Sequence, residues 1–400
     1  MSTATSSDEL LARPSWHDRK RYLWLLSMIV PLLPLAGWGL VNATGLPLFW
    51  WFGPMFVYVL MPLADVALGR DAENPPDSAL TWLEQDRYYR WCTYLFLPLQ
   101  YATMAWACWM WTRGGSGALS PVDKLGLAAT MGMVSGIAIN TAHELGHKKE
   151  HHERWFAKIA LAPVLYGHFF IEHNRGHHVR VATPEDPASS KLGESFWHFL
   201  PRTMYGSLRS GWALEARRLR RMDRRTWTLS NDILNAWLMS VVLFGALTAV
   251  FGLTVLPYLI VQAILGMTLL EVVNYLEHYG LLRRTEANGR FERVQARHSW
   301  NSNSIASNVF LYHLQRHSDH HANPTRRYQA LRDTAGAPEL PVGYAGMILL
   351  AYCTPLWRRI MDAKVVAHYG GDYSAANVYP PARAGLAARF GADHQVRSGG

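Results

Sequence analysis

The sequence predicts an all-α polytopic membrane protein with six transmembrane helices and a cytoplasmic, helical, histidine-rich domain. Three observations support this prediction. Half of the 400 residues are hydrophobic and 17% are charged, whereas soluble domains average about 25% charged residues. The apolar residues are concentrated in uncharged runs of membrane length, and the 18 histidines are concentrated in a few short motifs.

Four uncharged runs lie in the first part of the chain, at residues 22–41, 46–64, 91–112 and 125–142. A helix needs about 20 apolar residues to cross a hydrocarbon core roughly 30 Å thick. Each run has a suitable length, and the third is rich in Trp and Tyr, which favour membrane interfaces. Prolines within the runs do not oppose the assignment, because membrane helices tolerate them.

The apolar run at residues 233–270 contains 38 residues. At about 1.5 Å per residue it is too long for one span and suits two, with the break expected between Gly252 and Pro257. These runs together predict six spans. The shorter runs 159–171 and 340–357 are expected to form helices of the aqueous domain or of its membrane-facing surface.

The distribution of Lys and Arg predicts the orientation. Basic residues precede the first span, occupy the 65–90 loop and include six arginines within residues 217–225, whereas the intervening turns hold only Arg113 and Lys124. The positive-inside rule therefore places both termini and all long segments in the cytoplasm. The predicted organisation is a polar lead (1–21), spans one to four (22–142), a cytoplasmic segment (143–232), spans five and six (233–278), a second cytoplasmic segment (279–385) and a flexible tail (386–400).

The cysteines Cys92, Cys108 and Cys353 form no CxxC pair and lie in apolar surroundings. We expect them to be buried free thiols, as suits a reducing compartment. The sequence also has no fingerprint of a flavin or nicotinamide site, and its arginine-rich stretches do not form a basic domain of the nucleic-acid-binding type. Neither flavin, NAD nor a nucleic-acid partner is therefore expected.

Fifteen of the 18 histidines lie between residues 143 and 321. Residues spaced i, i+3 and i+4 share a helix face, so we expect His143 and His147 to aim at one point, and the same for His173 with His177. The triplet of the last motif is expected to do likewise, and each HH doublet adds a ligand on the neighbouring flank. Nine of these histidines lie in four motifs, HELGH, EHNRGHH, NYLEHYG and LQRHSDHH. The nine are His143, His147, His173, His177, His178, His278, His317, His320 and His321.

The predicted topology places all four motifs at one face of the membrane. Two spans separate the first two motifs from the last two, and a chain that crosses the membrane twice returns to the same face. Neutral histidine is a good ligand for iron, zinc, copper and nickel, and nine imidazoles suit two ions better than one. Carboxylates beside the ligands commonly accept the outer N–H of a ligating histidine. The residues expected to accept such bonds are Glu144, Glu172, Glu277 and Asp319. Whether one of them is instead a metal ligand is left open.

Six histidines lie outside this shared pattern. His168 is retained as a residue near the site but not as a ligand. The other five are expected to play no part in metal binding: His151, His152, His198, His298 and His313.

The motifs HELGHKK, EHNRGHH, NYLEHYGL and LQRHSDHHANPTRRYQ resemble those of the integral-membrane alkane hydroxylases, the alkane 1-monooxygenases. That family belongs to the membrane desaturase–hydroxylase superfamily, with the general pattern HxxxH, HxxHH and HxxHH, although the second motif here is HxxxHH. The resemblance extends over residues 22–373. It implies a di-iron centre held by the nine histidines and no haem.

The family's reaction is the hydroxylation of the terminal methyl group of medium- and long-chain n-alkanes to primary alcohols, with O₂. The resemblance implies that electrons come from rubredoxin, in trans or fused, and from a flavoprotein reductase. It implies a bacterial cytoplasmic membrane enzyme. Helix spacing back from the histidines suggests that an apolar substrate channel is lined by Leu270, Asn274, Val309 and Leu314.

The arginine cluster permits two interpretations. A basic cytoplasmic face steers an acidic electron carrier, and the residues that would do so are Arg217, Arg218, Arg220 and Arg221. An ordinary helix facing solvent or lipid headgroups is the alternative, and it is favoured.

Three other classes of protein compete with this assignment. A fatty-acyl desaturase or a xylene-type methyl hydroxylase would share the histidine pattern and differ in product. A histidine-rich metal transporter would need ligands midway through its spans and a path to both faces. A bis-histidine haem protein would need facing histidine pairs within the bilayer, which clusters of three do not suit.

Overall fold

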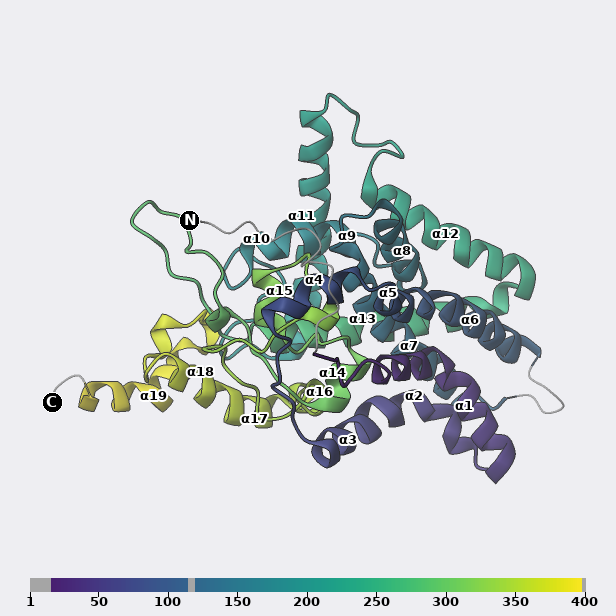
Figure 1. The fold of residues 1–400 in the computed structure, drawn as a ribbon, viewed down its shortest axis with the longest axis horizontal. Helices are drawn as coiled ribbons and strands as arrows, with labels where there is room; N and C mark the ends of the chain where they lie inside the picture. The colour runs from purple at the N-terminus through teal and green to yellow at the C-terminus, as the bar shows by residue number, and fades with distance from the viewer. Residues whose placement is uncertain (1–15, 114–118, 398–400) are drawn as a thin grey trace.

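The computed structural model describes residues 16–113 and 119–397, and these residues are helical, with isolated β-bridges and no β-sheet. Figure 1 shows the helices wrapped around a central one, α7. The α-helices are α1 (Ile29–Thr44), α2 (Phe52–Met55), α3 (Met61–Leu68), α4 (Asp77–Gln85), α5 (Arg87–Tyr94), α6 (Phe96–Arg113), α7 (Pro121–Gly146), α8 (His151–Leu161), α9 (Phe169–Glu172), α10 (His178–Arg180), α11 (Phe196–Arg221), α12 (Asp232–Phe251), α13 (Leu256–Glu277), α14 (Ile305–Phe310), α15 (His317–Ala322), α16 (Tyr344–Tyr352), α17 (Thr354–Trp357), α18 (Ala363–His368) and α19 (Arg383–Arg397).

Among the described residues, five helical segments are long and apolar enough to cross a membrane: Leu23–Thr44, Pro47–Leu68, Pro121–Gly146, Asp232–Phe251 and Leu253–Glu277. The chain is therefore a multi-pass membrane protein, as the sequence predicts. The remaining predicted span, 91–112, is helical in α5 and α6 but is not among the five, since its Trp, Tyr and Gln side chains lower its mean hydropathy. The count of six spans stays a prediction.

Helix α7 forms the centre of the molecule and is buried along almost its whole length. It approaches α13 closely at Gly132, Gly136 and Gly266, where a Cβ atom on Gly266 would lie 3.2 Å from the backbone nitrogen of Gly136. Small residues allow such approach in membranes, and hydrogen bonds between helices reinforce it. Ser135 donates one such bond to the side chain of Gln262 at 2.7 Å.

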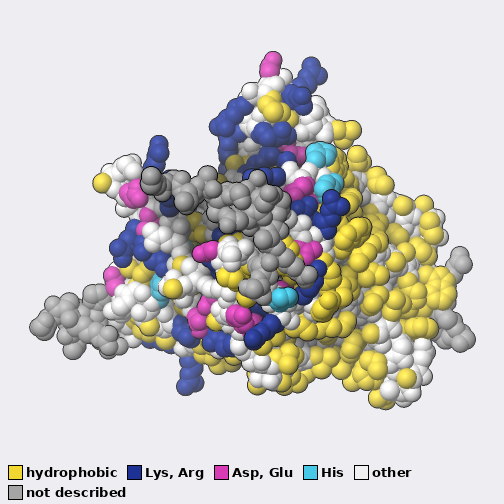
Figure 2. Space-filling model, in the orientation of Figure 1, with side chains coloured by type: hydrophobic (Ala, Val, Ile, Leu, Met, Phe, Trp, Pro, Cys, Tyr) yellow, Lys and Arg dark blue, Asp and Glu magenta, His cyan; other side chains and the backbone are white. Residues whose placement is uncertain are grey.

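The surface divides into an apolar and a charged part. Figure 2 shows hydrophobic side chains over the right of the view, where Figure 1 places α1, α6 and α12, and charged side chains at the left and top. Val241 and Val250 of α12 are 65% and 67% exposed, which suits contact with lipid rather than water. The charged part contains α8 to α11 and the segments after α13.

Three predictions about individual segments can be compared with the structure. Cys92 and Cys108 are buried, but Cys353 is exposed, because the turn between α16 and α17 carries it to the surface. The predicted flexible tail, 386–400, is helical in α19 as far as residue 397, and its flexibility stays a prediction. Of the polar lead, residues 1–15 lie outside the described residues.

Gly53 tests the packing of α2 against α7. A Cβ atom there would lie 2.5 Å from the Cα of Thr130, and this backbone contact has no flexible atom that could yield. Gly53→Ala should therefore lower the free energy of unfolding by about 1–3 kcal/mol, seen as a lower melting temperature in detergent. Gly39→Ala in α1, where nothing lies within 4 Å, is the matched control and should gain stability; equal effects would contradict this packing.

Candidate metal centre

Two membrane helices end at the centre. His143 lies in the last turn of α7, and His147 is the residue that caps its C-terminus. His278 caps the C-terminus of α13 in the same way. Helix C-termini carry a partial negative charge, so both helices direct a field at this point that favours a bound cation.

The second motif adopts a π-helical turn, His173–His177, between α9 and α10. A π-helical turn contains one residue more than an α-helical turn and is frequent at functional sites. It brings the Nε2 atoms of His173 and His178 to 3.1 Å from each other, although the residues are five apart. The turn thereby accommodates the extra residue of the HxxxHH spacing.

The nine histidines converge in two adjoining groups. The ligand atoms of each group all lie within 4.8 Å of one another. One group contains five histidines, His143, His147, His173, His178 and His320, and the other contains four, His177, His278, His317 and His321.

This division corrects the simple rule that residues on one helix face share a point. His143 and His147 do share a group, but His173 and His177, in the π-helical turn, lie in different groups although their rings are stacked with centroids 5.1 Å apart. The last motif is also divided, since His320 approaches His178 at 3.2 Å whereas His321 approaches His317 at 3.0 Å. Each of these motifs therefore contributes to both groups.

The donor atoms fit a bound cation in each group. The Nε2 atoms of His143, His147 and His177 are buried without a hydrogen-bond partner. The Nε2 atoms of His278 and His317 lie 3.1 Å apart. Because Nδ1 of His278 donates to a backbone carbonyl, its Nε2 presents a lone pair that a cation between the two rings could bind. Two nitrogens that bind the same metal ion at about 2.1 Å lie about 3 Å apart when the two bonds are at right angles.

Burial keeps these imidazoles in the form that binds metals. It lowers the pKa of His173 and of His320 well below the ordinary 6.5, and neighbouring imidazoles lower the pKa further. The pKa of His278 falls to about 3 for the same main reason. Since a ligating histidine must be neutral, the folded chain offers its nitrogens without first having to release protons.

The four carboxylates predicted to accept histidine N–H groups have other partners. Glu144 pairs with Lys148 at 2.9 Å, Glu172 with Arg180 at 2.7 Å, and Asp319 with Arg326 at 2.7 Å. Glu277 lies beside a histidine, but its oxygen is 3.3 Å from Nε2 of His317, the nitrogen that faces the second group. Three of these carboxylates thus pair with adjacent cations, whereas Glu277 faces the second group of histidines, where it could enter the ligand set. Their role at the metal centre stays a prediction.

Two other acceptors orient the ligands. Asp186 accepts a hydrogen bond from Nδ1 of His177 at 2.9 Å, and the backbone carbonyl of His298 accepts one from Nδ1 of His278 at 2.9 Å. Such bonds fix the tautomer and leave Nε2 free for a metal. No local signal in the sequence marks these acceptors, because they lie in loops that only the fold brings to the helix ends.

The remaining histidines lie outside both groups in the described part of the chain. His168 packs against the ring of Tyr166, with ring centroids 4.3 Å apart, and His298 contributes its backbone rather than its ring. The others of the six that the sequence left out of its pattern, His151, His152, His198 and His313, also lie outside the groups.

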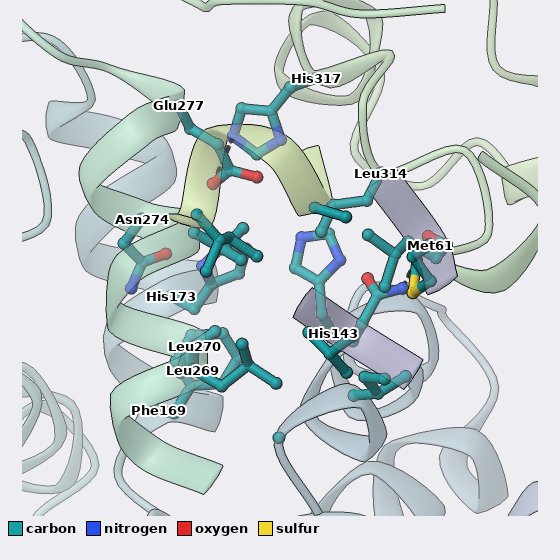
Figure 3. A pocket seen from close by; sticks show the side chains of 18 residues that line it. Met61, His143, Phe169, His173, Leu269, Leu270, Asn274, Glu277, Leu314 and His317 are labelled. Carbon is teal, nitrogen blue, oxygen red and sulfur yellow. Dashed lines mark hydrogen bonds and ion pairs between the residues drawn. The ribbon is translucent and has the colours of Figure 1, made fainter. Parts of the chain in front are cut away.

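An apolar pocket leads to the histidines. Figure 3 shows Glu277 and His317 toward one end of the pocket, His143 and His173 next to them, and Leu269, Leu270 and Phe169 farther along. Of the four predicted lining residues, Leu270, Asn274 and Leu314 line the pocket. Val309 does not: it is buried in α14 and packs away from the pocket.

The arginines proposed as a docking surface lie at the far end of α11. Arg217, Arg220 and Arg221 are exposed there. Arg218 differs from them, because it pairs with the buried Glu215 at 2.5 Å and lies 3.9 Å from Asp232. Docking of an electron carrier at these residues stays a prediction.

Comparisons with known proteins agree with the site. A family model described as fatty acid desaturase matches residues 124–351. The alkane 1-monooxygenase of Acinetobacter baylyi is 45% identical over 96% of this chain and 94% of its own length, and that of Pseudomonas putida is 46% identical over 96% and 95%. The xylene/toluene monooxygenase hydroxylase component of Pseudomonas putida is 26% identical over 66% of this chain and 70% of its own length. The chain thus belongs to the fatty acid desaturase family and, within it, to the group of the alkane 1-monooxygenases.

Proposed function

We propose that this chain is a membrane di-iron monooxygenase that hydroxylates the terminal methyl group of medium- and long-chain n-alkanes to primary alcohols. The observation that carries the proposal is the position of two adjoining groups of histidines, eight of the nine buried, beside an apolar pocket between membrane helices that three of them line. The names of the similar proteins support the substrate class. The xylene-type relative is more distant in both identity and coverage.

The nine histidines would hold two iron ions, one in each group, and Asp186 with the carbonyl of His298 would orient two of them. Histidine nitrogens suit iron among other first-row metals, so the choice of iron rests on the relatives. When bound, iron supplies the activation of O₂ that an unactivated C–H bond requires.

The chain's own residues position the substrate. Leu269, Leu270 and Val273 of α13 face apolar residues of the opposite wall, so the pocket accepts an alkane chain and excludes water. Polar groups occur where the pocket approaches the histidines, at Asn140, Asn274 and Glu277. An alkane lying lengthwise therefore presents its end, and not its middle, to the metal centre.

Electrons would come from rubredoxin, reduced in turn by a flavoprotein reductase, and the enzyme would lie in the bacterial cytoplasmic membrane with its active site at the cytoplasmic face. The basic loops of the predicted topology support this orientation. The exposed side of the centre is consistent with delivery from water, because His178 is half-buried while its neighbour Val179 is 65% exposed.

Removal of one histidine tests the two-iron assignment. His320→Ala should lower the iron content of the purified enzyme from about two to about one per chain, since it removes a donor from one group of five. Metal analysis with Mössbauer spectroscopy measures this change. His151→Ala, an exposed histidine outside both groups, should keep full iron; full activity with a single iron in the parent enzyme would contradict the assignment.

Asp186→Asn tests the orienting hydrogen bond to His177. The amide keeps the shape but loses the charge that stabilises the N–H donor, so iron affinity or turnover should fall by ~10–100-fold. The exposed neighbour Glu185 provides the control Glu185→Gln, which should behave as the parent. Chelator competition measures the affinity, and no difference between the two variants would remove Asp186 from the site.

Leu270→Phe tests the channel. The larger side chain narrows the pocket, so kcat/KM for a long alkane should fall by ~10-fold or more relative to a short one. Ile264→Phe, on the same helix but facing outward and 51% exposed, should leave the chain-length profile unchanged. A profile unaffected by Leu270→Phe would show that alkanes bind elsewhere.

A further inference from the structure

Helix α11 presents three distinct faces. Phe199, Thr203, Ser207 and Gly211 are buried against the other helices. A second face is apolar but exposed, and it runs at helical spacing through Trp197, Pro201, Tyr205, Leu208 and the half-buried Trp212. A third face, next to it, carries Arg202, Arg209 and Arg220.

The helix lies across the aqueous ends of the membrane helices. Thr203 donates a hydrogen bond to Glu271 of α13 at 3.0 Å, and Trp212 stacks with Trp237 in the second turn of α12, with centroids 6.2 Å apart. The side chain of Glu215 accepts a bond from the first residue of α12, Asp232, at 2.8 Å. These contacts place α11 at the level where α12 enters the membrane, and Figure 1 shows it running across the direction of α12.

The far end of α11 and the loop after it are strongly basic. Within residues 209–230, Asp223 is the one exposed acidic residue among the charged residues. The exposed arginines of this segment form no ion pair with any described residue. Figure 2 shows this basic surface at the top of the view, directly beside the hydrophobic surface. The exposed arginines are Arg209, Arg217, Arg220, Arg221, Arg224 and Arg225.

We propose that α11 lies in the plane of the membrane surface and that the arginines at its far end bind the headgroups of anionic lipids. A helix with an apolar face in the acyl boundary and a basic flank is the type that lies in this interface. Guanidinium groups bind phosphate through paired hydrogen bonds. Clustered Arg residues beside a span attract anionic lipids ~fivefold per residue.

Two observations favour lipid over a soluble acidic carrier as the partner. Trp227 and Leu229, in the loop that carries Arg224 and Arg225, are 76% and 70% exposed, and aromatic residues mark membrane interfaces. In Figure 1 the far end of α11 also extends away from α10 and α15, which carry histidines of the metal centre. An electron carrier would need to approach those helices.

The test compares two triple variants of the iron-loaded enzyme in which only exposed side chains change. Native mass spectrometry counts the lipids retained from micelles that contain equal amounts of phosphatidylglycerol and phosphatidylcholine. The first variant should lose its preference for phosphatidylglycerol by ~fivefold per arginine, while the second should keep it. The first is R209Q/R220Q/R225Q, and the matched control, in the loop after α13, is R284Q/R290Q/R293Q.

Equal preference for phosphatidylglycerol in both variants and the parent would overturn the proposal. The proposal would also be overturned if the first variant kept its lipid preference but required more rubredoxin for half-maximal turnover, since that result assigns the arginines to carrier docking. Equal melting temperatures of the two variants exclude a folding defect as the cause of lipid loss. The proposal concerns the membrane surface and stands whether or not the assignment of iron is correct.

Discussion

Nine imidazoles, eight of them buried, can share one site only if hydrogen bonds join their ring nitrogens or positive charge lies between them, and the rest of the structure depends on this constraint. Burial and neighbouring imidazoles lower the pKa of His173 and of His320 well below 6.5, so these rings do not supply positive charge by binding protons. The separations of 3.0–3.2 Å between Nε2 atoms are those of donors around a common centre. The ends of α7 and α13 add the negative poles of two helix dipoles.

The membrane fold meets this constraint by bringing two helix ends to one place. Small residues at Gly132, Gly136 and Gly266 allow α7 and α13 to approach closely, so their C-terminal ends deliver His143 to one group of histidines and His278 to the adjoining group. The same two helices form walls of the apolar pocket. One packing interface therefore determines both where a metal pair binds and which part of a lipid-soluble chain reaches it.

Much of this was predictable from the sequence, because membrane spans and histidine motifs depend on local patterns. The nine histidines selected by spacing are the ones that the fold brings together, although their role as ligands stays a prediction. The division into two groups was not predictable from an ideal helix, since the π-helical turn at His173–His177 changes the register. Asp186 and the carbonyl of His298 were missed because neither stands at a helical spacing from its histidine: Asp186 follows His177 by nine residues, and His298 follows His278 by 20. Val309 is buried but does not line the pocket.

The most direct test of the central claim is iron X-ray absorption spectroscopy of the purified enzyme, which reports the ligands around each metal without reference to activity. The account predicts first shells dominated by imidazole nitrogen, four or five per iron, with the multiple scattering that histidine rings produce. Shells dominated by carboxylate oxygen or containing sulfur would contradict the claim that these histidines hold the metals.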